Sequence, residues 1–144
     1  MSLVTRKIRH VHQGVGLEGY FACPDSPTSS FPGILIAPAW AGCNDQAMER
    51  ANILAKAGYA AFAIDLYGEG RVGKTRDECS QLMGTVARDR NFLFDRLMST
   101  LDALNAQPEV DVSRTAAIGF CFGGLCVLDL ARGGAPLRGV VSLH

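Results

Sequence analysis

A cysteine flanked by glycines is the feature that most constrains the fold of this chain. The apolar run Ala116-Ala117-Ile118 is typical of a buried strand, and it leads directly into Gly119-Phe120-Cys121-Phe122-Gly123-Gly124. This pattern predicts a strand that turns abruptly into a helix with the thiol of Cys121 at the apex, the Gly-x-Cys-x-Gly form of a nucleophile elbow. The glycines allow the tight crossing, because bulky side chains at positions 119 and 123 would block it.

The position of Cys121 at the start of a predicted helix gives its thiol a particular environment. Free backbone N–H groups and the helix dipole favour negative charge there, on a thiolate or on an oxyanion that develops beside it. Cys121 is therefore a candidate nucleophile for acyl transfer. The alternative interpretation is a structural cysteine, buried where a strand meets a helix.

Around the elbow, short apolar strands alternate with amphipathic helices. Two antiparallel strands are expected first, at residues 6–13 and 15–23. The segments expected after them are a strand at 33–37, a helix at 45–56, a strand at 59–66, a helical stretch at 75–104 in which Gly84 marks a break, a strand at 115–120, a helix at 122–131 and a strand at 137–143. This order predicts an α/β fold: a doubly wound, mostly parallel sheet flanked by helices, with an antiparallel N-terminal strand pair. One domain is expected over residues 1–144.

Three loops of this predicted sheet fall at the same edge. In a doubly wound sheet, ligands bind beyond the carboxyl ends of the parallel strands. The segments 38–44 and 65–73 and the elbow at Cys121 all follow such strands. Their convergence supports an active site more strongly than the elbow does alone.

Composition excludes several other classes of function. Fourteen acidic and fourteen basic residues cancel, so nothing points to nucleic acid or to an anionic membrane, and no apolar run approaches the length of a membrane span. The five cysteines are odd in number and scattered, with no Cys-x-x-Cys pair and no Cys/His cluster. We therefore expect no disulfide framework, no metal site and no cofactor, and the reduced thiols favour a cytoplasmic location.

Several segments carry a resemblance to a known family. They are the elbow with its double glycine, Ala57-Gly58-Tyr59-Ala60, Ile64-Asp65-Leu66-Tyr67-Gly68, Leu35-Ile36-Ala37 followed by Ala41-Gly42-Cys43-Asn44, and Val140-Val141-Ser142-Leu143-His144. Over nearly its whole length the chain resembles the dienelactone hydrolases, a branch of the α/β-hydrolase superfamily. The resemblance implies hydrolysis of a small-molecule carboxylic ester or lactone. It also implies that Cys121 attacks the carbonyl carbon and that the backbone N–H groups of Phe122 and Trp40 form the oxyanion hole.

The chain departs from the family pattern in two places. Ala39 stands where family members carry a glutamate that contacts the resting thiol. The chain also stops at His144, and no residues after Cys121 supply both the acid and the histidine of a triad. Asp129 is expected to point away from the site, and His144 is expected to be a strand-end residue rather than the base. The chain thus corresponds to the N-terminal portion of the fold.

These departures leave other functions open. One is a catalytically silent fragment that self-associates, because a bare sheet edge at residues 140–141 invites pairing with another chain as a homodimer. Thioesterase or peptidase action on the same fold is a further alternative. The first alternative differs from ester hydrolysis in its partner and the second in its substrate, and both are compatible with the predicted fold.

Other polar residues near the predicted site have two interpretations each. Arg71 either binds a substrate carboxylate or belongs to a solvated basic patch with Lys74 and Arg76. Asp65 ends a strand as a catalytic acid does, yet it precedes the nucleophile, so a hydrogen bond that anchors its loop is favoured. Trp40 either lines the pocket or packs in the core.

Two histidines and three cysteines are expected to play no part in the chemistry. His10 and His12 lie on the first, outlying strand and are predicted at the surface. Cys23, Cys43 and Cys126 are predicted as small apolar residues of the core.

Overall fold

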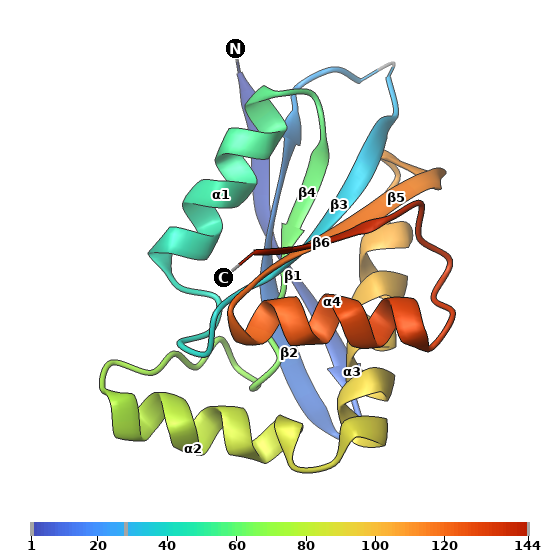
Figure 1. The fold of residues 1–144 in the computed structure, drawn as a ribbon. Helices are drawn as coiled ribbons and strands as arrows, with labels where there is room; N and C mark the ends of the chain where they lie inside the picture. The colour runs from blue at the N-terminus through green and yellow to red at the C-terminus, as the bar shows by residue number, and fades with distance from the viewer. Residues whose placement is uncertain (1, 28, 144) are drawn as a thin grey trace.

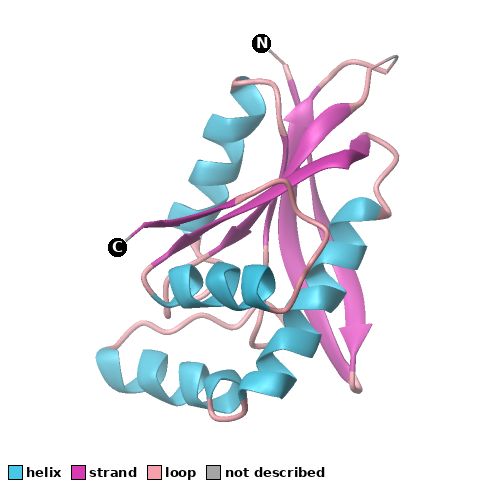
Figure 2. Ribbon diagram, turned by 45° about the vertical axis from the view of Figure 1, so that its right-hand side comes forward, coloured by secondary structure: helices cyan, strands magenta, loops and turns pink. Residues whose placement is uncertain are grey.

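The computed structural model describes residues 2–27 and 29–143, which form three layers with a central sheet between helices (Figure 1). Helix α1 covers one face of the sheet, and helices α3 and α4 cover the other (Figure 2). The elements are β1 (Leu3–His12), β2 (Val15–Pro24), β3 (Phe31–Ala37), α1 (Asp45–Lys56), β4 (Ala60–Ala63), α2 (Arg76–Ala87), α3 (Arg90–Asn105), β5 (Val110–Phe120), α4 (Phe122–Arg132) and β6 (Val140–Leu143). The predicted α/β fold is confirmed.

The sheet has the strand order β1-β2-β4-β3-β5-β6. The N-terminal pair β1–β2 is antiparallel, as predicted, and β2 also runs antiparallel to β4, whereas β4, β3, β5 and β6 are parallel neighbours. In the β3–β5 register Ala37 pairs with Gly119. The two strands therefore end side by side, which brings the loop after β3 next to the elbow.

The helix ends follow the capping residues. Asn44 accepts a hydrogen bond from the N–H of Ala47 at the start of α1, and Thr75 accepts one from Glu78 at the start of α2. The predicted break of the long helical stretch at Gly84 is wrong, because Gly84 lies inside α2. The break falls before α3, where the Asp89 carboxylate accepts hydrogen bonds from the first turn and starts a new helix.

Two apolar clusters hold the layers together. The larger one lies between the sheet and α3 and α4, and it is built from leucines, phenylalanines and valines. The smaller one lies under α1 and is rich in alanine, with Ala47, Ala51 and Ala55 packed on Ala61 and Ala63. Small side chains let α1 approach the sheet closely, so that its N-terminal half stands beside the carboxyl ends of the strands.

The last strand forms one edge of the sheet. β6 pairs with β5 on one side, and its outer residues Val141 and Leu143 are 52% and 42% exposed. In the described part of the chain, no helix combines the length and the apolar character that a membrane crossing requires.

Candidate active site

The elbow has the strained backbone that its glycines predict. Cys121 has φ +58° and ψ −114°, a conformation that side chains rarely adopt, and it joins β5 directly to α4. A Cβ on Gly119 would lie 2.0 Å from the carbonyl oxygen of Gly123, and a Cβ on Gly123 would lie 1.9 Å from the carbonyl oxygen of Ala37. The strand and the helix can therefore cross at this distance only with glycine at both positions.

The backbone of Cys121 is fixed while its side chain is free. Its N–H donates to the carbonyl of Leu143 at 2.8 Å, and its own carbonyl accepts from Gly124 at 2.9 Å. The side chain is exposed, and among the described residues it has no hydrogen-bond partner. The thiol is thus presented to solvent at the N-terminus of α4, where first-turn N–H groups such as that of Phe122 have no intrahelical acceptor.

Three other cysteines have the opposite environment. Cys23, Cys43 and Cys126 are buried, as predicted. Burial raises the pKa of Cys23 and of Cys43 to about 11 and that of Cys126 to about 12, so these groups stay neutral thiols at physiological pH. Among the five cysteines, only Cys121 is exposed.

The loop after β3 lies against the elbow and is held by the loop after β4. The hydroxyl of Tyr67 donates to the carbonyl of Trp40 at 2.7 Å, and the N–H of Gly73 donates to the carbonyl of Ala41 at 2.9 Å. The N–H of Trp40 donates to no acceptor within the described residues. The predicted convergence of the three loops is therefore present.

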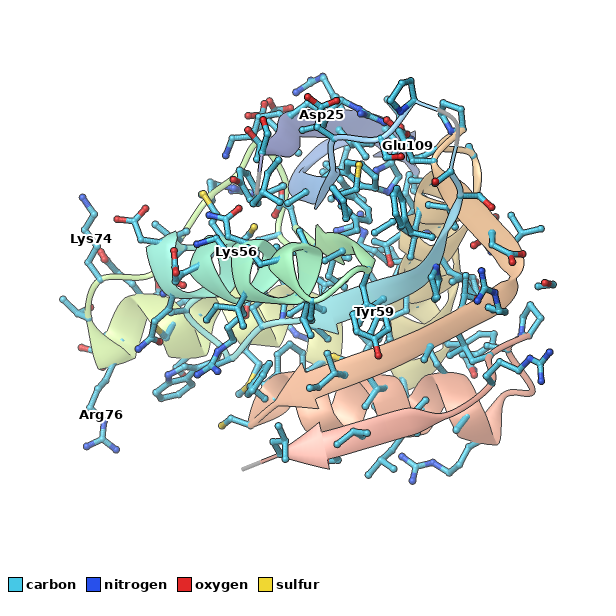
Figure 3. The ribbon with its side chains drawn as sticks, turned by 90° about the horizontal axis from the view of Figure 1, so that it is seen from above. Asp25, Lys56, Tyr59, Lys74, Arg76 and Glu109 are labelled. Atoms are coloured by element: carbon cyan, nitrogen blue, oxygen red, sulfur yellow. The ribbon has the colours of Figure 1, made fainter. Side chains whose placement is uncertain are left out.

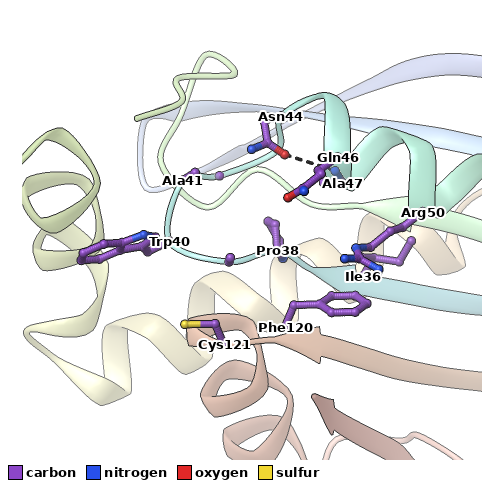
Figure 4. A pocket seen from close by; sticks show the side chains of 12 residues that line it. Ile36, Pro38, Trp40, Ala41, Asn44, Gln46, Ala47, Arg50, Phe120 and Cys121 are labelled. Atoms are coloured by element: carbon purple, nitrogen blue, oxygen red, sulfur yellow. Dashed lines mark hydrogen bonds between the residues drawn. The ribbon is translucent and has the colours of Figure 1, made fainter. Parts of the chain in front are cut away.

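A cavity of about 350 Å³ opens beside the thiol. Its lining includes Cys121, Trp40, Asn44, Gln46, Arg50 and Phe120 (Figure 4). The guanidinium of Arg50 lies 4.0 Å above the ring of Phe120, and no carboxylate in the described ranges forms an ion pair with it. Arg50 is thus a cation with free donors that faces the same space as the thiol.

A second cavity of about 360 Å³ lies on the other side of Cys121. Its walls are the apolar side chains of Trp40, Met83, Phe122 and Leu125. The indole of Trp40 points towards α2 (Figure 4). Trp40 therefore does both of the things predicted as alternatives, since it lines cavities and also packs against the larger core cluster.

Asp65 anchors its loop, which is the interpretation that the sequence favoured. It is 1% exposed, and its carboxylate accepts four hydrogen bonds at 2.8–3.0 Å from the backbone N–H groups of Glu18, Tyr67, Gly68 and Gly70. No lone pair in good geometry remains for a substrate or for a catalytic histidine.

The structure does not bring Arg71 to the cavity beside Cys121. Its guanidinium donates to the carbonyls of Tyr67, at 2.6 Å, and of Gly68. Lys74 and Arg76 extend into solvent at the start of α2 (Figure 3). The sequence analysis did not identify Arg50, because a charged residue on a predicted helix is usually part of its solvent-exposed face. Only the folded structure shows that Phe120 lies beneath the Arg50 guanidinium.

The remaining acid and the histidines lie away from the elbow or outside the described residues. Asp129 is paired with Arg90 at 2.6 Å and with Arg132, and the hydrogen bond from Arg90 lowers the pKa of this carboxyl. The prediction that His10 and His12 lie at the surface is wrong: both are half-buried, because β1 packs on α3. His144 lies outside the described residues, and no group of three potential metal ligands occurs within them.

His10 and His12 contact α3 through their ring nitrogens. The His10 Nε2 lies 3.3 Å from Ser99 Oγ, and the His12 Nδ1 accepts from Arg96 at 3.1 Å. Burial lowers the pKa of both histidines. Neither ring is therefore available to Cys121 as a base in this arrangement.

The sequence and the fold match known hydrolases. The model of the dienelactone hydrolase family matches residues 17–144. The crystal structure of a dienelactone hydrolase-like promiscuous phosphotriesterase from metagenomic libraries has a TM-score of 0.95 and 40% identity, and the match covers 100% of this chain and 60% of that one. A carboxymethylenebutenolidase homologue from Yersinia pestis is 28% identical over 92% of this chain and 50% of its own length. A probable 2-oxo-3-(5-oxofuran-2-ylidene)propanoate lactonase from Bradyrhizobium sp is 31% identical over 73% of this chain and 42% of its own length.

The extent of these matches differs between this chain and its relatives. The chain spans half or less of the length of these two curated relatives, and 60% of the solved structure. The family match, by contrast, runs from residue 17 to residue 144 and includes strands β3 to β6, the elbow and both loops of the site. The chain therefore belongs to the dienelactone hydrolase family, a family of carboxylic-ester hydrolases.

Proposed function

We propose that this chain carries the nucleophile and the oxyanion hole of a hydrolase that acts on carboxylic esters or lactones. The observation that carries the proposal is the exposed thiol of Cys121, on a strained backbone at the start of α4, with no hydrogen-bond partner among the described residues. A group held in this way is free to react.

The proposed reaction proceeds through a thioester. The thiolate of Cys121 attacks the carbonyl carbon, a C–S bond forms, and the π electron pair moves to the oxygen, where the N–H groups of Phe122 and Trp40 stabilise the charge. The carbonyl re-forms as the C–O bond to the alcohol breaks, and the alkoxide takes a proton from water. A water molecule then attacks the thioester, the C–S bond breaks, and the acid and the thiol are released.

Deacylation is the slower half of this proposed cycle. No histidine or carboxylate of the described residues hydrogen-bonds to the thiol, so none of these residues is placed to activate the water that cleaves the thioester. We expect the acid and the histidine of the family triad to be absent from this chain. Rapid acylation followed by slow turnover is the kinetic consequence.

A substrate with a negative charge fits the cavity beside the thiol. The names of two relatives describe lactones that carry a carboxylate, and Arg50 presents unpaired donors in this cavity. We therefore assign to Arg50 the role that the sequence suggested for Arg71. The variant Arg50→Gln should slow acylation by an anionic aryl ester about tenfold and leave the rate with a neutral ester unchanged. Equal slowing of both rates would contradict this assignment.

The test of the nucleophile uses p-nitrophenyl acetate. We expect a burst of p-nitrophenolate that equals the amount of protein, and an acetyl group on the peptide that contains Cys121 in mass spectrometry. The variant Cys121→Ala should lose both, whereas Cys126→Ala, a buried cysteine one turn along α4, should keep both. A burst that persists unchanged in Cys121→Ala would exclude the proposal. Thioester and amide analogues of the same acyl group would separate esterase action from thioesterase and peptidase action.

Self-association is a second candidate, and one observation favours it. Val141 and Leu143 are exposed on the strand at the sheet edge, a surface that pairs readily with another strand. We propose a homodimer through this edge. Light scattering after size-exclusion chromatography should give the mass of a dimer at micromolar concentration, and Val141→Lys should reduce it to that of a monomer. A monomer at all concentrations would contradict the proposal. The cytoplasmic location and the absence of a nucleic-acid partner stay predictions.

A further inference from the structure

The apolar cavity between α2 and α4 has no role in the reaction described above. Met83 lies on the face of α2 that also carries the buried residues Cys79 and Val86, yet Met83 itself is only half-buried. Leu125 is likewise half-buried on α4, one turn after Phe122. Side chains that point inwards but keep exposed apolar surface mark a space that is open to a ligand.

The cavity is continuous with the reacting atom. Cys121 belongs to its lining, together with Trp40, Met83, Phe122 and Leu125, and none of these five side chains except the thiol can ionise. The Cys121 thiol thus stands between two unlike spaces, a cavity whose lining includes the polar side chains of Asn44, Gln46 and Arg50 on one side and an apolar cavity on the other. A molecule whose carbonyl carbon is attacked at Cys121 would extend into both.

We propose that the cavity between α2 and α4 is a substrate subsite that binds the hydrocarbon group of the ester attacked by Cys121. The inference rests on the proposed function for the attack, and it adds the substrate class: an ester whose acyl or alcohol group is an aromatic ring or an aliphatic chain of several carbons. The volume, about 360 Å³, lies in the range of pockets that bind small molecules. The flexible side chain of Met83 lets the cavity fit groups of different shape.

The physical consequence is a dependence of rate on chain length. Each methylene group that leaves water for an apolar surface favours binding by up to about fourfold, until the cavity is full. An aromatic ring should give about tenfold over a methyl group. Arg50 has no part in this effect, because it lines the opposite cavity.

The first experiment does not depend on ester hydrolysis. Cys121 is alkylated with iodoacetamide and with N-phenyliodoacetamide, and the ratio of the two rates is divided by the same ratio for free cysteine. We expect about a tenfold preference for the phenyl reagent. The variant Met83→Trp, which fills the cavity, should abolish this preference, and Gln81→Trp, an exposed position on the same helix, should retain it.

The second experiment follows acylation of Cys121 by p-nitrophenyl esters from acetate to octanoate, with a parallel series of acetates of lengthening alcohols. The rate should rise with chain length in one of the two series, which identifies the group that enters the cavity. Met83→Trp should remove the rise, and Met83→Ala should move the optimum to longer chains. If Met83→Trp fails to fold, Met83→Ala decides the question on its own.

The outcomes separate the subsite from the proposed function. A preference for the phenyl reagent without any acylation would support the cavity and exclude ester hydrolysis. Acylation by acetate without any chain-length dependence, and with no preference for the phenyl reagent, would support the nucleophile and overturn the subsite. A preference that Met83→Trp leaves unchanged would also overturn it.

Discussion

Asp65 and Cys121 stand at the carboxyl ends of two strands of one sheet, but their hydrogen bonding differs completely. The buried carboxylate of Asp65 accepts four backbone hydrogen bonds, whereas the exposed thiol of Cys121 accepts and donates none among the described residues. A saturated group holds structure, because its lone pairs are already used. A group left without partners on a fixed backbone is free for chemistry. The position of a residue at the end of a strand therefore does not show whether it is structural or reactive. Whether its side chain already has hydrogen-bond partners does.

The two regions also depend on each other. The loop that Asp65 holds carries Tyr67, whose hydroxyl donates to the carbonyl of Trp40. The segment around Trp40 in turn lies beside Cys121 in both cavities. The structural loop thus positions the backbone that we assign to the oxyanion hole, so substitutions in one region should be measurable in the other.

Substitution of Asp65 should have the largest effect on stability. In Asp65→Ala four buried or half-buried N–H groups lose their acceptor, and we expect a loss of about 4 kcal/mol in the free energy of unfolding. Urea unfolding measures it. Asp65→Asn should lie in between, because one amide oxygen keeps two of the four donors. Cys121→Ala is the matched control and should change stability by less than about 1 kcal/mol. Equal losses for Asp65→Ala and Cys121→Ala would remove the distinction between the two regions.

Substitution of Gly123 should break the reactive region without touching Asp65. A Cβ at this position would lie 1.9 Å from the carbonyl oxygen of Ala37, so α4 must move away from β3. We expect Gly123→Ala to cost about 3 kcal/mol and to abolish acylation of Cys121. Gly134→Ala is the control for loss of a glycine, because a Cβ at Gly134 has no neighbour within 4 Å and only its positive φ is strained. Full acylation in Gly123→Ala would show that the close crossing is not required.

Removal of the Tyr67 hydroxyl should sharpen the link between the regions. Tyr67→Phe removes the hydrogen bond that holds the carbonyl of Trp40, so the segment that carries the Trp40 N–H is less firmly positioned, and we expect acylation of Cys121 to fall about tenfold. Alkylation by iodoacetamide forms no oxyanion and should keep its rate, which separates loss of positioning from a change in the thiol. Tyr20→Phe is the control, since Tyr20 donates to Asn52 at 2.8 Å away from the elbow. A parallel fall in acylation and alkylation would indicate a general disturbance instead.

The elbow could be predicted from the sequence because its determinants are local. Gly119 and Gly123 are needed for a contact between a strand and the helix that follows it, and the pattern of adjacent residues carries that information. The alternation of strands and helices is local in the same sense. The anchoring role of Asp65 also followed from chain order, since an acid before the nucleophile does not fit the triad sequence.

The rest depends on contacts between distant segments. Arg50 meets Phe120 across 70 positions of sequence, through the register of β3 with β5 and the packing of α1, and no local pattern encodes this pairing. The break before α3 was misplaced for a different reason. Glycine lowers helix propensity, but the helix continues through Gly84. Asp89 instead caps the N-terminus of α3, and this cap sets the boundary between α2 and α3. His10 was misplaced because α3 covers β1 only in the folded chain.

The smallest effect on stability is expected for His10, whose hydrogen bonding is intermediate between that of Asp65 and that of Cys121. Its Nε2 has Ser99 as a partner while its Nδ1 is buried without a partner among the described residues, and burial lowers the pKa of the ring. Since the folded protein binds this proton less readily than the unfolded chain, the contribution of His10 to stability is complete above about pH 6.5 and declines as the pH falls below that value. The decline should be shallow, because His10 is only half-buried. Urea unfolding at pH 7.5 and pH 5.5 measures the decline. The variant His10→Gln cannot titrate, so it should reduce the difference in the free energy of unfolding between the two pH values. His12 retains its own lowered pKa in this variant. The same pH difference in His10→Gln as in the native chain would assign the effect to His12 alone.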